Sequence, residues 1–383
     1  MAQELSSAER LLRTIRWEPH DRVPILSPVP YDPTNDLIED RRPAWQREAN
    51  FEAVLELVRS YCDVFCRARG LGAMFDRRFL LTPPEYIEVV EQGRVGNRYV
   101  VVHRIRTPKG ELRTTTETVD GIHTSYYTEP LLKDLDDVER ILSVPYHFDP
   151  PDLAPFFEHR ARIGERGLAM VGVSTPMVCV SRMLQFEQFL MWCATERETI
   201  VRLVETAFER IYERLKWLLE RGVGPVFWMG GSEQATPPMM SRPFFEDLVV
   251  KYDKQLMDLI HSYGAYVYMH CHGKIGTVFD LILDMGPDLL DPLEPPPDGD
   301  LELAEAKQRA RGKIVLVGNI EPRDLEFADR ATVREKVRRA ICEGGKEGFI
   351  LKATDTAFAP LSDRYRDNCI EYINAGLEFG RIA

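Results

Sequence analysis

The chain has 383 residues, of which 44% are hydrophobic and 29% are charged. It carries 49 Lys and Arg against 61 Asp and Glu, so its formal net charge is −12. This composition is typical of a globular protein, and the length permits two or three average domains or one enlarged α/β barrel. The acidic surplus argues against a general nucleic-acid binder, which usually has an excess of basic residues.

The sequence shows no signal for export or for membrane insertion. Residues 1–7 lack a basic segment followed by an apolar one, and the longest nearly apolar run, Leu168 to Val180, is too short to span a bilayer. Seven cysteines, an odd number, are scattered along the chain, which is typical of reduced thiols. We therefore expect a cytoplasmic protein that binds neither a membrane nor nucleic acid.

Short apolar or β-branched runs alternate with longer helical patterns along most of the chain. In chain order, strands are expected at Val23–Ser27, Asp63–Arg67, Ala169–Ser174, Pro225–Met229, Ala265–His270, Leu289–Leu293, Ile314–Gly318 and Phe349–Ala353. Helical spacing of apolar residues marks Arg202–Glu220, Phe244–His261 and Asp329–Glu343. Eight strands that alternate with helices predict an α/β fold, a (β/α)8 TIM barrel that forms one domain over residues 1–383.

The segment from residue 85 to residue 129 departs from this alternation. Two β-rich runs, Tyr99–Ile105 and Leu112–Thr118, flank the turn residues Lys109 and Gly110. This pattern predicts a β-hairpin. We expect it to be an antiparallel excursion in the N-terminal part of the barrel and not a separate domain.

Enzymes with this fold place their reactive groups at the carboxyl ends of the strands. The strand expected at Ala265–His270 runs into Cys271, His272 and Gly273. Because residues i and i+2 of an extended chain point to the same side, both imidazoles are expected to face one centre while Cys271 points away. Neutral imidazole is a good ligand for zinc and related ions. The pair indicates a metal site or an acid–base site; the alternative is a polar strand end with a buried thiol.

Polar residues close other expected strands as well. Glu233 is a candidate ligand or base, and Asp291 and Glu294 are candidates to reach the mouth of the barrel. Asn319 lies in a Gly-Asn turn suited to backbone contacts with a ligand, and Asp355 is a candidate ligand or hydrogen-bond acceptor. The alternative for each carboxylate is a helix cap or a solvated loop acid, and for Asn319 it is ordinary turn chemistry.

Four segments of the chain resemble the uroporphyrinogen decarboxylase superfamily, which includes the porphyrin enzyme and the cobalamin-linked methyltransferases. They are Arg13 to Pro24, Glu129 to Asp137, Ser241 to Gly273, and Leu293-Glu294-Pro295 together with Val317 to Ile320. The resemblance implies a (β/α)8 barrel, in agreement with the independent strand count.

The resemblance is closer to the methyltransferase branch. Porphyrin decarboxylases carry an arginine-rich loop after the first strand, which carboxylate-rich tetrapyrroles need, whereas residues 26–33 here contain no arginine. The methyltransferases hold zinc with an H-x-C motif and a distant cysteine. The corresponding positions here are His270, His272 and the region of Asp355, where no cysteine stands. Such a set favours Lewis-acid or hydroxyl-activating chemistry over thiolate alkylation.

The first hypothesis is a zinc-dependent methyltransferase that acts on a small methoxylated or methylated compound. A corrinoid protein or a folate would be its methyl partner. The metal ligands would be His270, His272 and Asp355, and these residues and Glu233 would be catalytic. Substrate would be bound by Tyr31, Trp228, Glu294 and Asn319.

Two further hypotheses stay open. One is a metal-free lyase that decarboxylates a small acid, in which His270 or His272 protonates the carbanion and Asp355 orients the histidine. The other is a barrel that binds a ligand or a partner without turnover. The sequence leaves a homodimer as an open possibility and does not name the substrate.

Overall fold

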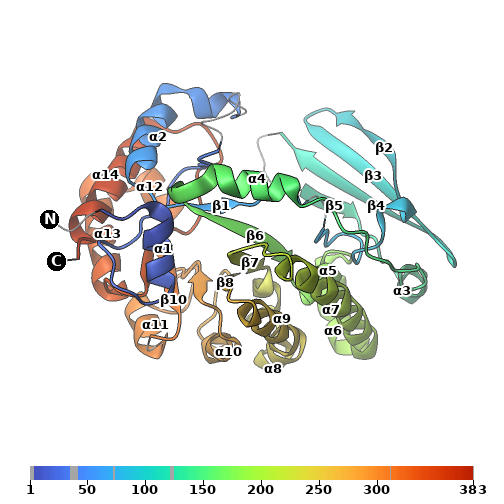
Figure 1. Ribbon diagram of the computed structural model, residues 1–383. Coiled ribbons are helices and arrows are strands. Elements are labelled where there is room, and N and C mark those ends of the chain that lie inside the picture. Colours follow the sequence, from blue (N-terminus) through green and yellow to red (C-terminus); the bar gives the residue numbers. More distant parts are fainter. Residues whose placement is uncertain (1–3, 35–41, 72–73, 121–124, 311, 383) are drawn as a thin grey trace.

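A curled parallel sheet forms the centre of the computed structural model, which describes residues 4–34, 42–71, 74–120, 125–310 and 312–382 (Figure 1). The seven strands lie in the order β1-β6-β7-β8-β9-β10-β11. Their bounds are β1 (Phe65–Arg67), β6 (Leu168–Ser174), β7 (Val226–Gly230), β8 (Tyr266–His270), β9 (Leu289–Asp291), β10 (Val315–Ile320) and β11 (Phe349–Ala353). Every neighbouring pair is parallel, so the carboxyl ends of these strands lie at one rim.

The segment Pro24–Leu26 runs between the two edge strands of this sheet. Leu26 N donates to Leu351 O (2.9 Å) and Leu351 N donates to Pro24 O (2.9 Å), while Asp63 N donates to Ile25 O (2.7 Å). These parallel bridges stand where the first of the eight strands was expected. The mixed α/β architecture is therefore of the TIM-barrel type.

A buried carboxylate holds this connecting segment in place. Asp63 is 1% exposed, and it accepts hydrogen bonds from Arg10 (2.7 Å), Arg22 (2.8 Å) and the backbone N–H of Ile25 (3.0 Å). Two guanidinium groups thus share one carboxylate that water does not reach. Because an unpaired buried charge is costly, this cluster fixes the N-terminal segment against the sheet.

Helices cover the outer face of the sheet, and the two ends of the chain lie close together (Figure 1). The helices are α1 (Ser7–Ile15), α2 (Ala49–Tyr61), α3 (Leu135–Leu142), α4 (Ala154–Ile163), α5 (Pro176–Ser181), α6 (Phe186–Thr195), α7 (Arg197–Leu219), α8 (Arg242–Phe245), α9 (Lys251–Ser262), α10 (Phe279–Met285), α11 (Leu303–Ala310), α12 (Pro322–Phe327), α13 (Arg330–Gly344) and α14 (Asp363–Phe379). Short 3₁₀ turns occur at η2 (Ala44–Arg47), η3 (Pro84–Tyr86), η4 (Gly164–Arg166) and η5 (Ser232–Ala235), and a π-helical turn, η6 (Glu246–Val250), joins α8 to α9. No helix in the described ranges is long and apolar enough to cross a membrane.

A second sheet, of four antiparallel strands, lies to one side of the parallel sheet (Figure 1). It consists of β2 (Ile87–Val95), β3 (Arg98–Thr107), β4 (Gly110–Val119) and β5 (Ser125–Glu129). The expected hairpin is its central pair, β3 and β4, joined by a tight turn at Thr107 and Gly110. The sheet is larger than the predicted hairpin, because β2 and β5 add one strand on each side of the central pair.

Alternation along the parallel strands creates a layer of polar side chains above an apolar one. Val226, Tyr268, Leu289 and Ile350 belong to one buried cluster inside the curled sheet. Since residues i and i+2 of a strand share a face, Trp228, His270, Asp291 and Lys352 are directed to the same interior, one step nearer the carboxyl rim. Phe65 packs against this cluster too, and Arg67 follows it at the end of β1.

Candidate functional site

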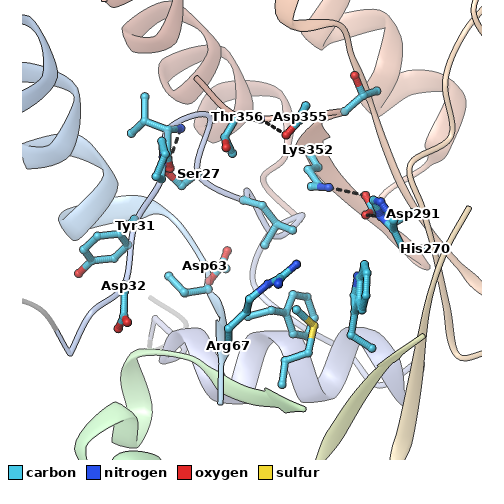
Figure 2. A pocket seen from close by; sticks show the side chains of 18 of the residues that line it. Ser27, Tyr31, Asp32, Asp63, Arg67, His270, Asp291, Lys352, Asp355 and Thr356 are labelled. Carbon is cyan, nitrogen blue, oxygen red and sulfur yellow. Dashed lines mark hydrogen bonds and ion pairs between the residues drawn. The ribbon is translucent and has the colours of Figure 1, made fainter. Parts of the chain in front are cut away.

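A cavity of about 560 Å³ lies above this polar layer (Figure 2). Its wall includes residues from the segment after Leu26, from β1, β7, β8 and β9, and from the end of β11. Lys352 and His270 meet Asp291 on one side, Tyr31 and Asp32 stand on the opposite side, and Arg67 reaches in between (Figure 2). The volume falls in the range of small-molecule sites.

The centre of the polar layer is a triad of His270, Asp291 and Lys352, in which Asp291 is buried and the other two side chains are partly exposed. His270 and Asp291 are paired residues of β8 and β9, so their side chains rise together. The Nδ1 of His270 is 2.7 Å from Asp291 Oδ2, and Lys352 Nζ is 2.6 Å from Asp291 Oδ1. Burial by itself would raise the pKa of Asp291, but the positive charge of Lys352 and the hydrogen bond from His270 outweigh it and lower that pKa.

A second histidine–carboxylate pair lies beside the triad. The Nδ1 of His272 is 2.8 Å from Glu294 Oε1, and Gly273 N donates to Glu294 Oε2 (2.5 Å). Gly273 has φ = +81°, a conformation that residues with a Cβ rarely adopt and that turns its N–H toward the carboxylate. Burial lowers the pKa of His272, but Glu294 more than offsets this and the net shift is upward. The pKa of Glu294 is correspondingly lowered, because His272 and the Gly273 N–H outweigh its burial.

The two imidazoles have the arrangement that metal ligands usually show. Their ring centroids are 4.5 Å apart and their planes are nearly perpendicular, at 84°. Each uses Nδ1 for a carboxylate, and neither Nε2 has a hydrogen-bond partner among the residues that the structure describes. A ligating histidine almost always gives its second ring nitrogen to a carboxylate or carbonyl, which fixes the tautomer and leaves the first nitrogen for the metal.

Two further carboxylates have an unsatisfied oxygen: Glu233, whose charge acts on His272, and Glu321, whose charge interacts with that of Glu294. Glu233 Oε2 and Glu321 Oε1 are buried without a hydrogen-bond partner in the described part of the chain. Burial and the neighbouring charge of Glu294 raise the pKa of Glu321 to about 7. Orphaned carboxylate oxygens of this kind are what a divalent cation or a hydrogen-bond donor of a ligand would satisfy. They make Glu233 and Glu321 candidates to complete a metal site with the two histidines.

The third predicted ligand, Asp355, sits at the cavity wall but is turned to its own backbone. Its side chain is exposed, and Oδ1 accepts a hydrogen bond from Thr356 N (2.7 Å). Ligand atoms of His, Cys, Asp or Glu lie within 4.8 Å of one another in two groups of the described residues, and neither includes Asp355, His270, His272, Glu233 or Glu321. One group is Asp32, Cys66 and His159, and the other is Glu85, His147 and Asp149.

The predicted substrate residues take up different places. Tyr31 and Trp228 line the cavity, and the Trp228 ring lies 5.1 Å from the ring of His270. Glu294 stands behind His272. Asn319 does not close a strand in a turn as expected. It lies inside β10, which continues to Ile320, and it is not part of the cavity wall.

Three cations of the described residues line the cavity, Arg42, Arg67 and Lys352, and none of them was predicted from the sequence. Lys352 interrupts the otherwise apolar strand β11, and a lysine inside such a strand was the available signal. Arg67 is the last residue of β1, and its guanidinium lies 5.2 Å from the Trp228 ring centroid. Residues 26–33 contain no arginine, so little positive charge was expected in the cavity. Lys352 and Arg67 nevertheless bring positive charge to its wall.

The family model described as uroporphyrinogen decarboxylase (URO-D) matches residues 105–353, which is more than half of the chain. None of the curated proteins with which the sequence was compared matches it. Among solved structures, a methyltransferase from Methanosarcina mazei is similar, with a TM-score of 0.61 and 16% identity, covering 98% of this chain and 99% of that one. A B12-independent methionine synthase from Shewanella sp. W3-18-1 has a TM-score of 0.46 and 12% identity, covering 93% and 97%. The first of these likenesses shows a shared fold.

Proposed function

Because the chain belongs to the uroporphyrinogen decarboxylase family, we propose that it is a metal-dependent methyltransferase of that family. The observation that carries the proposal is the pair of imidazoles at the end of β8. His270 and His272 line the same cavity, and each is oriented through Nδ1 by its own carboxylate. Zinc is the metal that such nitrogen and oxygen ligands suit best.

The proposed metal site consists of His270 and His272 with one or more carboxylates. Asp291 and Glu294 hold the two rings, while Glu233 and Glu321 offer buried oxygens that lack a partner. We propose one of these carboxylates as the oxygen ligand in preference to Asp355, whose carboxylate accepts a hydrogen bond from Thr356 N. When bound, the metal would supply a Lewis acid that activates a hydroxyl or polarises an oxygen of the substrate.

Sulfur contributes little to this site. Cys271 lies between the two histidines in sequence, but it is fully buried, and burial raises the pKa of its thiol well above its ordinary value. Among the described residues, no cysteine belongs to the cavity wall. A site of nitrogen and oxygen ligands keeps more positive charge on the metal than one with thiolates. This favours methyl transfer from or to an oxygen-bearing compound over alkylation of a metal-bound thiolate.

The other residues of the cavity would bind and orient the substrate. Trp228 and Tyr31 supply aromatic walls for a small methoxylated or methylated compound. Lys352 and Arg67 bring positive charge that would hold an acidic group of that compound. A corrinoid protein or a folate is the proposed methyl partner, and it would approach the open carboxyl rim.

Metal analysis tests the proposal directly. Untagged protein is stripped with a chelator, reconstituted with zinc and dialysed, and we expect about one bound zinc per chain. His270→Ala and His272→Ala should each weaken zinc binding by about tenfold or more. His261→Ala is the matched control and should retain zinc, because His261 pairs with Asp288 and belongs neither to the cavity wall nor to either group of clustered ligand atoms. Absence of stoichiometric zinc in the wild-type protein, or zinc retained in both His270→Ala and His272→Ala, would refute the proposed site.

A metal-free decarboxylase of a small carboxylic acid is the second candidate, and the cations in the cavity favour it. Lys352 and Arg67 would bind the carboxylates of an acid, and His270, oriented by Asp291, would give its proton to the carbanion left when carbon dioxide departs. This function predicts carbon dioxide release that is unaffected by chelator. The methyltransferase predicts activity that chelator removes and zinc restores.

A further inference from the structure

A second cavity, of about 480 Å³, lies between the antiparallel sheet, the loop at residues 75–78 and the end of α5. Its wall combines Arg77, Arg78 and Arg182 with the hydroxyl-bearing side chains of Thr116, Ser125 and Tyr127. Arg77 and Arg78 come from the loop between β1 and β2, Arg182 follows α5, and the three hydroxyls come from β4 and β5. Four separate parts of the chain therefore bring three arginines and three hydroxyls to one place.

Only one of these arginines is neutralised within the wall. Arg78 forms a two-pronged ion pair with Asp76, with its NH2 2.7 Å from Oδ2 and its Nε 3.0 Å from Oδ1. Asp76 is the one acidic residue in this wall. Within the described residues Arg77 and Arg182 form no ion pair, and the Nε of Arg182 is buried without any hydrogen-bond partner.

The two unpaired guanidinium groups also influence each other. Burial and the nearby charge of Arg77 together lower the pKa of Arg182. The charge of Glu233 raises the pKa of Arg182 and so opposes this effect, but Glu233 forms no hydrogen bond with Arg182. Like charges held together in a partly buried place destabilise the empty protein. Such an arrangement is stabilised when an anion enters and bonds to both groups.

We propose that this cavity is a binding site for a small organic anion, held through a phosphate or carboxylate group by Arg77 and Arg182. Guanidinium groups bind both kinds of oxyanion with paired, charge-assisted hydrogen bonds, and hydroxyls such as that of Tyr127 complete the ring of donors. The cavity is larger than a single phosphate needs, so it has room for the body of a small molecule.

The site is separate from the one proposed for methyl transfer. The wall of the main cavity contains none of these three arginines, and its own arginines are Arg42 and Arg67. A smaller cavity of about 400 Å³ shares Asp76 and Arg78 with the anion site and reaches Ala68, the neighbour of Arg67. The walls of the main cavity and of the anion site have no residue in common, so a substitution in one wall leaves the other wall intact.

Calorimetric titration of the full chain with inorganic phosphate and with succinate tests the proposal. We expect at least one of them to bind, and the stronger of the two identifies the oxyanion. Arg182→Gln should weaken that binding by about tenfold or more, since it removes a charge-assisted donor to the anion. Arg338→Gln is the control and should bind as the wild type does, because Arg338 pairs with Glu335 on the surface and lines neither cavity.

Arg77→Gln provides a second variant should Arg182→Gln fold poorly, and it should weaken binding in the same way. Thermal unfolding gives an independent readout, because a ligand that binds only the folded state raises the midpoint. We expect phosphate or succinate to raise the midpoint of the wild type and of Arg338→Gln, but not that of Arg182→Gln. The proposal is overturned if neither anion binds, or if binding survives unchanged in both Arg77→Gln and Arg182→Gln.

Discussion

Replacing Asp291 by asparagine is the sharpest test of how the polar layer is held together. The side chain of Asp291 is 2% exposed and takes two charge-assisted hydrogen bonds, at 2.6 Å from Lys352 and 2.7 Å from His270. Asparagine has nearly the same shape, so it creates no cavity. It removes the negative charge, however, and it offers His270 an NH2 group or a weaker carbonyl in place of a carboxylate.

The expected cost follows from this geometry. Removing one member of a buried ion pair leaves the other charge uncompensated, which typically destabilises a protein by about 3–5 kcal/mol. Lys352 keeps some access to water, so we expect the lower end, about 3 kcal/mol. With an unfolding entropy of about 2.1 cal/mol/K per residue, a chain of this length loses roughly 4 °C in its midpoint of thermal unfolding.

The pH dependence of this difference has a defined sign. The pKa of Asp291 is lowered below its ordinary value of 3.8, because Lys352 and His270 outweigh its burial. The stabilisation is therefore fully present above the ordinary value and is lost as the pH falls through the lowered one. Thermal unfolding of wild type and Asp291→Asn should differ equally at pH 5 and pH 8, and the difference should shrink below about pH 4.

Glu305→Gln is the control, since Glu305 forms an exposed ion pair with Arg309 at 3.3 Å. Exposed pairs of this kind contribute about 0–1 kcal/mol, so this variant should unfold within about 1 °C of the wild type. A change as small as this in Asp291→Asn would refute the reasoning. So would a difference that grows toward acidic pH, because the carboxylate would then be destabilising in the folded state.

Three other substitutions test neighbouring parts of the structure. Asp63→Ala should destabilise the chain by about 3–5 kcal/mol in urea unfolding, because buried Arg22 loses its carboxylate partner and Arg10 keeps only Asp21. A loss below about 1 kcal/mol would contradict this. The stability of Glu321→Gln relative to the wild type should increase as the pH rises from 5 to 8. The reason is that burial raises the pKa of Glu321 to about 7, so its ionisation destabilises the folded wild type. A pH-independent difference would contradict this. Glu294→Gln should lower the pKa of His272, because Glu294 raises that pKa against the effect of burial. An NMR titration of the imidazole resonances measures the change, and an unchanged pKa would contradict the prediction.

The sequence predicted the strand order of the parallel sheet because buried parallel strands are nearly continuous apolar runs with clear ends. It did not predict β2 and β5, and the physical reason is visible in their burial. Nearly all of β2 is exposed on both faces, so its residues have no apolar alternation to mark a strand. The strand β2 forms by pairing with β3, and the register of that pairing cannot be read from the sequence of β2 alone.

The candidate site was predicted only in part, for a similar reason. The spacing of His270 and His272 required only the geometry of one strand. The pairing of His270 with Asp291 required the register between two strands, which no local pattern provides. Asp355 lies at the end of a strand, where functional groups are expected. A short carboxylate can also accept a hydrogen bond from the neighbouring backbone, and Asp355 accepts one from Thr356 N.

Net charge is a poor guide to what the second cavity binds. The formal charge of −12 argued against a general nucleic-acid binder. Charges on the surface are screened over about 8 Å at physiological ionic strength, so a ligand inside a cavity responds mainly to the groups that line it. In the main cavity Arg42, Arg67 and Lys352 stand against four aspartates, so positive charge does not dominate its wall. The second cavity is lined by three arginines and one aspartate, and this local excess of positive charge suits it to an anionic ligand.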